Sequence, residues 1–323
     1  MNQAPVGALV AGLRRHGLTD VDDSDLAKSL YASDAGIYRV APQVVVRPRD
    51  TGEVEATLSV ARETGVPLTM RGAGTSIAGN AIGTGIVVDT SKHLNKVLAL
   101  DREARTALVQ PGAVHASLQR RAVPAGLRFG PDPSTHTRCT IGGMIGNNAC
   151  GSRALAYGRT VDNVEALTVL LADGSIVRSS RDGVDSSTAV AELGSLVDAH
   201  LDVVRTEFGR FGRQVSGYSF EHLLPEKGRR FDRFLVGTEG TLGVVLDATV
   251  RLVEDAPARA LAVLGFASMA DAADAVPTLL EHPLVACEGL DHRITDLVPG
   301  HPELPPGAGW LFAEVTGATG AEA

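Results

Sequence analysis

Two glycine-rich segments, about 60 residues apart, constrain this chain more than any other feature. The first glycine segment, "RGAGTSIAGNAIG", runs from Arg71 to Gly83, and the second glycine segment, "PDPSTHTRCTIGGMIGNNACGS", runs from Pro131 to Ser152. Glycine lacks a Cβ, so backbone N–H groups in such segments can approach an anion closely. Arg71 is the only charged residue of the first segment. We interpret the two segments as walls of one site for a large anionic cofactor.

The glycine spacing excludes two common nucleotide-binding motifs. Gly72 and Gly74 are followed next by Gly79, which does not match the dinucleotide-binding fingerprint, and no Gly-Lys-Ser/Thr follows as in a P-loop. A tight turn without a ligand stays open as an alternative for the first glycine segment. The glycine density nevertheless favours a ligand or a close approach, because each glycine carries an entropic cost on folding.

Composition excludes several classes of protein. The chain has 323 residues, 44% of them apolar, which is enough for about two domains with substantial cores. Its net charge of -8 argues against a general nucleic-acid or anionic-lipid partner. Cys139, Cys150 and Cys287 form no CxxC pair, so we expect no disulfide framework, iron-sulfur cluster or zinc site in this chain. No transmembrane segment or secretory leader is visible, which predicts a cytoplasmic protein; peripheral association with the inner face of the membrane stays open.

The order of helix-like and strand-like patterns predicts an α+β protein. A helix is expected from Thr51, capped by Asp50, and a strand over Val66 to Met70 leads into the first glycine segment. Two β-branched runs around Asp173-Gly174 predict a hairpin. A late strand with apolar residues at every second position, from Val244 to Leu252, is expected to cover a core with one face.

Three motifs in order, "RGAGTSIAG", "PGAVHASLQRRAVPAGLRFGPDPSTHTRCTIGGMIGNNACG" and "GTEGTLGVV", resemble flavoproteins with a vanillyl-alcohol-oxidase-type (PCMH-type) FAD-binding domain. The resemblance covers roughly Ala41 to Val253 and is strongest to the FAD-linked 2-hydroxyacid dehydrogenases that act on D-lactate, glycolate or D-2-hydroxyglutarate. The second segment and "RQVSGYSFEHLLPE" (Arg213 to Glu226) are most similar to large members that carry a C-terminal iron-sulfur module. The resemblance implies a helical lead-in (1–37), a PCMH-type domain of two α+β subdomains (38–254) and the start of an incomplete α+β cap (255–323).

The resemblance also implies which residues bind FAD. The pyrophosphate is expected on the backbone of the first glycine segment, the ribityl and isoalloxazine parts on the second, and the adenine side near the third motif. The residues implied are Arg71, Gly72, Ala73, Gly74, Thr75, Ser76, Pro131, Asp132, Ser134, Thr140, Ile141, Gly142, Gly143, Asn147, Gly151, Glu239, Gly240 and Val245. Some family members attach flavin covalently through a histidine at the position of Thr75, so noncovalent FAD is expected here.

The reaction implied is oxidation of a 2-hydroxy acid by hydride transfer to flavin N5, with electrons passing to an iron-sulfur, quinone or cytochrome-type acceptor. An iron-sulfur module or subunit is the implied partner. The family holds its substrate mainly with a C-terminal cap that about 70 residues cannot complete, so no catalytic residue and no metal ligand is assigned. Two alternatives stay open: a non-catalytic FAD-binding subunit or truncated fragment, and a flavoenzyme like UDP-N-acetylenolpyruvoylglucosamine reductase, which the second glycine segment disfavours.

Several side chains have structural interpretations beside functional ones. His115 lies on a predicted amphipathic helix and is expected to be structural, as is Cys139. His136 fits a surface loop histidine better than a catalytic base. Asn147 and Asn148 could contact flavin or satisfy backbone groups of their own loop, and both interpretations stay open.

Overall fold

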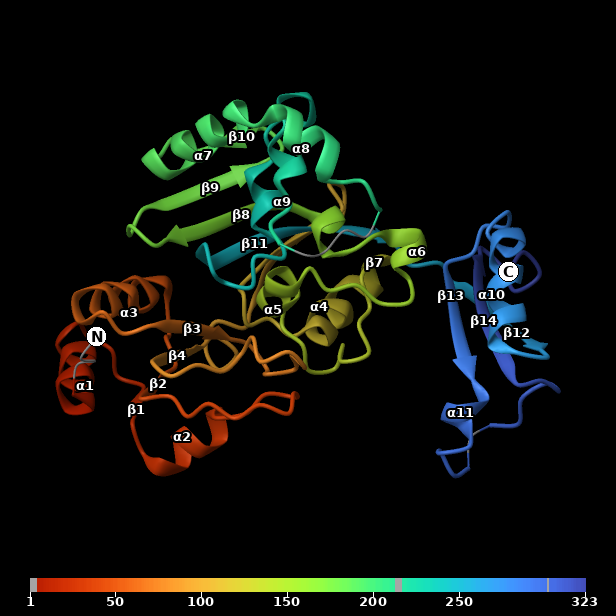
Figure 1. The fold of residues 1–323 in the computed structure, drawn as a ribbon, viewed down its shortest axis with the longest axis horizontal. Coiled ribbons are helices and arrows are strands. Elements are labelled where there is room, and N and C mark those ends of the chain that lie inside the picture. Colours follow the sequence, from red (N-terminus) through yellow and green to blue (C-terminus); the bar gives the residue numbers. More distant parts are fainter. Residues whose placement is uncertain (1–4, 213–216, 301) are drawn as a thin grey trace.

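Three β-sheets organise the chain, each with its own helices (Figure 1). The computed structural model describes residues 5–212, 217–300 and 302–323, so the first four residues of the "RQVSGYSFEHLLPE" motif lie outside the described residues. The chain combines helices with sheets whose strands are mostly antiparallel, which confirms the α+β prediction.

The first sheet mixes parallel and antiparallel pairing. In spatial order its strands are β1 (Val21–Asp22), β2 (Val44–Val46), β4 (Ile86–Asp89) and β3 (Leu68–Arg71). Strands β2, β4 and β3 are parallel, and β1 pairs with β2 in the antiparallel direction. The accompanying helices are α1 (Val6–Arg15), α2 (Asp25–Tyr31) and α3 (Thr51–Thr64). The lead-in therefore contains the expected helices, but it also adds a strand to this sheet.

Helix α3 begins and ends where the sequence predicts. The Asp50 side chain accepts a hydrogen bond from the Glu53 backbone N–H at 2.9 Å, and Gly65 ends the helix in a left-handed conformation. Val60 and Ala61 pack with α1 and with the valines of β2 and β4 in one core. The buried apolar residues of β2 and of β4 up to Val88 are typical of parallel strands that are covered on both faces, and β4 ends in the buried Asp89.

The second sheet is antiparallel. Its strands are β10 (Gly183–Val184), β9 (Ile176–Ser180), β8 (Val164–Leu171), β11 (Gly243–Glu254), β6 (Thr106–Val109) and β5 (Val97–Asp101), with β7 (Leu127–Phe129) beside β11. Its helices are α4 (His115–Ala122), α5 (Ile141–Asn147), α6 (Ala154–Tyr157), α7 (Thr188–Ala199), α8 (Leu201–Glu207) and α9 (Phe231–Leu235). The predicted hairpin is confirmed as β8 and β9. The predicted alternation is confirmed in β11, where Val244, Leu246, Ala248, Val250 and Leu252 are buried.

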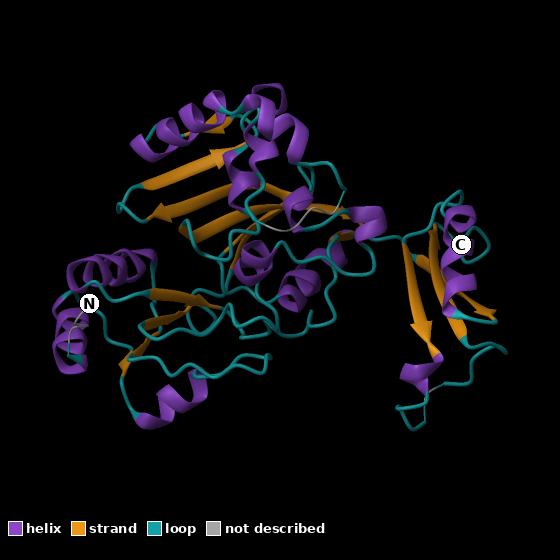
Figure 2. Cartoon of the chain, in the orientation of Figure 1, coloured by secondary structure: helices purple, strands orange, loops and turns teal. Residues whose placement is uncertain are grey.

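A small core joins the first and second sheets. Val54 of α3 and Leu94 pack there against Leu170 of β8 and against Val244 and Leu246 of β11. Figure 2 shows that loops make up most of the chain between the first sheet and helices α4 and α5. The ends of elements from both sheets meet in this region.

The third sheet lies at the opposite end of the molecule from α1 (Figure 1). Its order is β12 (Ala258–Phe266), β14 (Gly309–Gly317) and β13 (Ala286–Asp291), all antiparallel. Helices α10 (Met269–Leu279) and α11 (His292–Thr295) accompany it. Only residues 255–257 separate β11 from β12.

Candidate functional site

A cleft lies where the two glycine segments meet. It holds about 920 Å³ of space, its open mouth included. The first glycine segment forms one wall and helix α5 of the second segment forms another. Val169 of β8 and Val245 of β11 contribute apolar side chains, and the turn before β11 completes the lining. The predicted pair of walls therefore exists and encloses a single space.

The first wall presents backbone N–H groups without partners. The chain leaves β3 at Arg71, and Gly74 takes a positive φ of 66°. Within the described residues, the backbone N–H groups of residues 73–76 donate no hydrogen bond to other protein groups. Consecutive unpaired N–H groups in a turn form an anion-binding concavity. This wall suits a phosphate or pyrophosphate.

Arg71 supplies the positive charge of this wall. Its Nη1 donates hydrogen bonds of 3.0 Å to the carbonyl oxygens of Ser33 and Ala81. The guanidinium lies directly behind Gly74, because a Cβ added there would stand 2.4 Å from Arg71 Nη2. The charge is thus fixed immediately beneath the unpaired N–H groups.

The second wall is built on the short helix α5, which the glycine-rich sequence did not predict. Thr140 caps α5, since its Oγ1 accepts a hydrogen bond from the Gly143 N–H at 3.2 Å. The Gly142 N–H donates to the Pro111 carbonyl at 2.7 Å, which fixes the start of the helix. The walls touch, because a Cβ at Gly72 would stand 2.1 Å from Thr140 Oγ1.

The "GTEGTLG" turn is fastened to the other end of α5. The N–H groups of Gly237 and Glu239 donate to the carbonyls of Ile145 and Gly146 at 2.8 and 2.9 Å. Glu239 adopts a positive φ of 55°, which is uncommon for a residue other than glycine. Its carboxylate side chain is exposed at the cleft.

Most of the residues implied by the resemblance come together in this cleft. The cleft is lined by Arg71, Gly72, Ala73, Gly74, Thr75, Ser76, Thr140, Gly142, Gly143, Asn147, Glu239, Gly240 and Val245. Sequence reasoning did not single out the remaining lining residues, which are Met70, Asn80, Ala81, Thr90, Pro111, Ile145, Gly146, Val169, Leu235, Thr238 and Gly243. Pro111, Ile145, Gly146, Thr238 and Gly243 belong to the quoted motifs, so the motifs themselves could have pointed to them. Direct FAD contact stays a prediction for the residues that the resemblance implies.

Five implied residues do not line the cleft: Pro131, Asp132, Ser134, Ile141 and Gly151. Ile141 is fully buried in the core of the second sheet. Asp132 pairs with Arg153 at 3.0 Å, and Gly151 lies against Asp132. Pro131 accepts a 2.8 Å hydrogen bond from His115 Nε2. Their assignment to FAD also stays a prediction.

His115 and Asn148 have structural roles here. Burial lowers the pKa of His115 to about 4, so the ring is neutral and donates through Nε2 to Pro131. Asn148 takes a positive φ of 47°, and its side-chain oxygen accepts from the Val161 N–H at 3.0 Å. Asn147, in contrast, is exposed at the cleft. Burial raises the pKa of Cys139, which keeps that thiol protonated.

The chemistry of the cleft is that of a binding site. Among the described residues, Arg71 and Glu239 are the charged groups of the lining, and the lining contains no histidine, cysteine or tyrosine. No cluster of histidine, cysteine or acidic residues in the described part of the chain could hold a metal ion. Unpaired N–H groups with Arg71 beside an apolar floor fit a cofactor that joins a pyrophosphate to flat rings. FAD has that composition, so the residues present fit it.

Comparisons with known proteins agree with this fit. A family model described as "FAD binding domain" matches residues 42–180. The chain is 31% identical to a D-2-hydroxyglutarate dehydrogenase of Pseudomonas putida, over 91% of this chain and 32% of that protein. It is 35% identical to the glycolate oxidase subunit GlcD of Bacillus subtilis, over 73% of this chain and 43% of that protein. It is 33% identical to a D-lactate dehydrogenase of Archaeoglobus fulgidus, over 79% of this chain and 48% of that protein. The chain contains an FAD-binding domain, and the proteins that it resembles act on 2-hydroxy acids.

The chain spans about a third to a half of the length of these relatives of the 2-hydroxyacid dehydrogenase family. Among solved structures, an alkyldihydroxyacetonephosphate synthase matches with a TM-score of 0.71 and 18% identity, over 98% of this chain and 56% of that one. That likeness concerns the fold, and it confirms the expected PCMH-type architecture. Every helix in the described residues is too short or too polar to cross a membrane.

Proposed function

We propose that this cleft binds FAD noncovalently. The observation that carries the proposal is the row of unpaired N–H groups at residues 73–76, backed by Arg71, in the same cleft as α5. Residues 71–76 would hold the pyrophosphate, and Gly142, Gly143 and Asn147 would lie along the rings. Noncovalent binding is supported by Thr75 and by the lack of histidine, cysteine and tyrosine in the described lining.

We further propose that FAD serves the oxidation of a 2-hydroxy acid such as D-lactate, glycolate or D-2-hydroxyglutarate. Bound FAD would accept the hydride at N5, and the electrons would pass to an iron-sulfur, quinone or cytochrome-type acceptor. In this proposal residues 38–254 form the FAD-binding domain and 255–323 form part of a substrate cap. The residues that line the cleft would hold the cofactor, and the apolar floor of the cleft would exclude water.

A direct test is to identify the pigment of the purified protein. We expect yellow protein that releases FAD into the supernatant on acid precipitation, because no covalent bond would hold it. An Arg71→Met variant should bind FAD roughly 10- to 100-fold more weakly, since charged hydrogen-bonding groups contribute about 1.5–3 kcal/mol. Colourless protein that takes up no added FAD would contradict the proposal, and flavin that stays with the precipitate would contradict noncovalent binding.

A second candidate function is FAD binding without catalysis by this chain. It is favoured by one observation: in the described lining Glu239 is the sole carboxylate and no histidine or lysine is present. Removing the hydroxyl proton of a 2-hydroxy acid requires a positioned base within hydrogen-bond reach. The catalytic groups would then lie on another part of the protein or on a partner.

Anaerobic reduction separates the two candidates. Addition of D-lactate, glycolate or D-2-hydroxyglutarate should bleach the flavin absorbance if this chain carries the substrate groups. Dithionite provides the matched control, because it reduces any bound flavin. If dithionite bleaches the yellow protein but none of the three acids does, the result would support FAD binding without catalysis by this chain.

A further inference from the structure

Arg71 carries its charge without a carboxylate partner, although one lies close by. Asp89 is the residue paired with Arg71 in the parallel strands β3 and β4. Opposite charges on adjacent strand positions attract one another. Within the described residues, however, no ion pair joins Arg71 to a carboxylate, and its guanidinium donates hydrogen bonds to the carbonyl oxygens of Ser33 and Ala81. The Asp89 carboxylate instead accepts hydrogen bonds from Tyr31 and Ser91.

Tyr31, at the end of helix α2, contacts both Asp89 and Arg71. Its hydroxyl donates a 2.6 Å hydrogen bond to Asp89 Oδ2, and the Arg71 guanidinium carbon lies over its ring, 5.1 Å from the centroid. A neutral ring attracts a cation without cancelling its charge. Burial and the hydrogen bond to Asp89 raise the pKa of Tyr31, so the phenol stays protonated and continues to donate.

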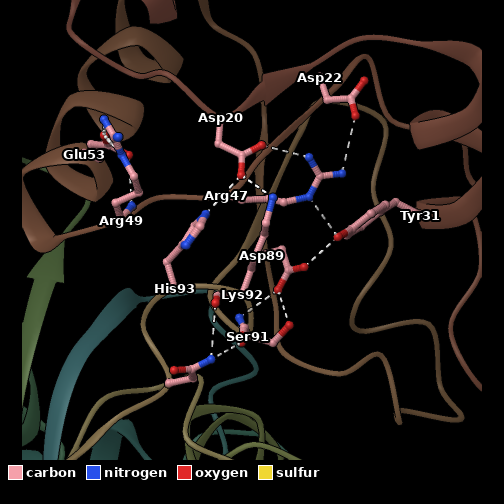
Figure 3. Close-up of polar contacts among 11 residues, drawn as sticks. Asp20, Asp22, Tyr31, Arg47, Arg49, Glu53, Asp89, Ser91, Lys92 and His93 are labelled. Atoms are coloured by element: carbon pink, nitrogen blue, oxygen red, sulfur yellow. Dashed lines mark hydrogen bonds and ion pairs between the residues drawn. The ribbon is translucent and has the colours of Figure 1, made fainter.

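The tyrosine is itself fixed by a polar network (Figure 3). Arg47 Nε donates to the Tyr31 hydroxyl at 3.3 Å, and Arg47 also pairs with Asp20 at 3.0 Å. The other oxygen of Asp89 accepts from the backbone N–H and hydroxyl of Ser91, both at 2.7 Å. Both oxygens of Asp89, which is 5% exposed, are therefore engaged. Tyr31, which contacts both Arg71 and Asp89, belongs to the lead-in segment.

We propose that Tyr31 is a positioning residue that keeps Arg71 unpaired for the anionic part of the cofactor. Its hydroxyl holds Asp89 and its ring covers the guanidinium, so the full charge of Arg71 remains available beneath residues 73–76. The inference rests on the proposed function, because the ligand is the pyrophosphate of FAD.

A Tyr31→Phe variant tests this inference, because it retains the ring and releases Asp89. Affinity would be measured for FAD and for adenosine diphosphate, which carries a pyrophosphate without the flavin. We expect Tyr31→Phe to weaken both roughly three- to fivefold, the value of a partly exposed ion pair. Tyr31→Phe/Asp89→Asn should return to within about twofold of wild type, because no carboxylate is left to compete. In an Arg71→Met background, Tyr31→Phe should have no further effect.

Tyr38→Phe is the matched control, since Tyr38 is exposed and should leave both affinities unchanged. Thermal unfolding of each apo variant identifies any loss of folding, and Asp89→Asn alone, with Tyr31 retained, should bind at least as well as wild type. The inference is overturned if Tyr31→Phe binds like wild type, if Asp89→Asn fails to rescue it, or if its effect persists without Arg71. Wild-type protein that binds neither ligand would overturn the proposed function as well, whereas the other outcomes leave FAD binding intact.

Discussion

His115 links protonation to the stability of the second wall. Its ring is 2% exposed and holds the Pro131 carbonyl through Nε2, while Nδ1 has no hydrogen-bond partner in the described residues. Burial lowers its pKa from 6.5 to about 4, and burial lowers the pKa of His222 to about 4 as well. Between these values the unfolded chain binds a proton that the folded chain does not. The contribution of these neutral histidines to the free energy of unfolding is therefore fully present above pH 6.5, and it falls as the pH drops toward 4.

We predict that His115→Gln flattens this acid dependence. Glutamine can still donate to Pro131 but takes up no proton. The wild-type free energy of unfolding should fall by about 2 kcal/mol per buried histidine between pH 7 and pH 5. Urea unfolding at several pH values measures the slope, and His222→Gln should reduce it independently. A slope unchanged in both variants would show that other groups control the acid sensitivity.

The glycines of the first segment illustrate what sequence can and cannot establish at single residues. Their number led us to expect a ligand, yet Gly72 and Gly83 are explained by packing, since a Cβ at either would stand 2.1 Å from a threonine hydroxyl. Gly74 and Gly79 are explained by positive φ. The observation that points to an anion is the unpaired N–H groups, which depend on backbone geometry and cannot be counted in a sequence.

Among the secondary-structure elements, helix α5 gives the second wall of the cleft its shape. Its sequence, "IGGMIGN", has poor helix propensity, because glycine loses more entropy than other residues. The cap from Thr140 and the buried side chains of Ile141, Met144 and Ile145 compensate for this. No helix was predicted here from the sequence, because tertiary packing rather than helix propensity makes this helix.

We predict that Thr140→Ala destabilises the protein by about 1 kcal/mol through loss of this cap. Thr140→Ser keeps the hydroxyl and should retain most of the stability, which makes it the matched control. Denaturant unfolding at neutral pH measures the difference. Equal stability of the alanine and serine variants would mean that packing alone holds the start of α5.

Elements with strong local patterns were predictable, and those that depend on distant partners were not. Helix α3, the β8–β9 hairpin and the alternation of β11 follow from caps, turn residues and periodicity. Strand β1 has two residues and exists because Val21 pairs with Val46 across the sheet. The contact between Tyr31 and Arg71 likewise joins residues whose proximity depends on the fold.

At the scale of the whole molecule, Arg153 joins the third sheet to the rest. Its guanidinium binds Asp132 at 3.0 Å and both carboxylate oxygens of Glu314, on β14, at 2.9 to 3.2 Å. The Arg153 and Glu314 side chains are only 20% and 15% exposed. Asp132 belongs to the second glycine segment, so one arginine connects that segment with residues 255–323.

We predict that Arg153→Ala loosens this connection and costs about 3 kcal/mol, because it leaves two partly buried carboxylates without their partner. Limited proteolysis should then cut faster within 255–257, and thermal unfolding should begin earlier. Arg205→Ala removes an exposed pair with Glu226 and serves as the control, with little effect expected. Equal cleavage rates in both variants would argue that the third sheet is held by other contacts.

The contact between Gly72 and Thr140 has a consequence for the order of folding. The cleft exists only after β3 of the first sheet and α5 beside the second have come together, across nearly seventy residues of intervening chain. Contacts so distant along the chain form late, since the loop between them must close first. An intermediate with one finished sheet would offer half a binding surface. Cofactor capture would then mark the end of folding, and flavin colour in a growing cell would report chains that have completed it.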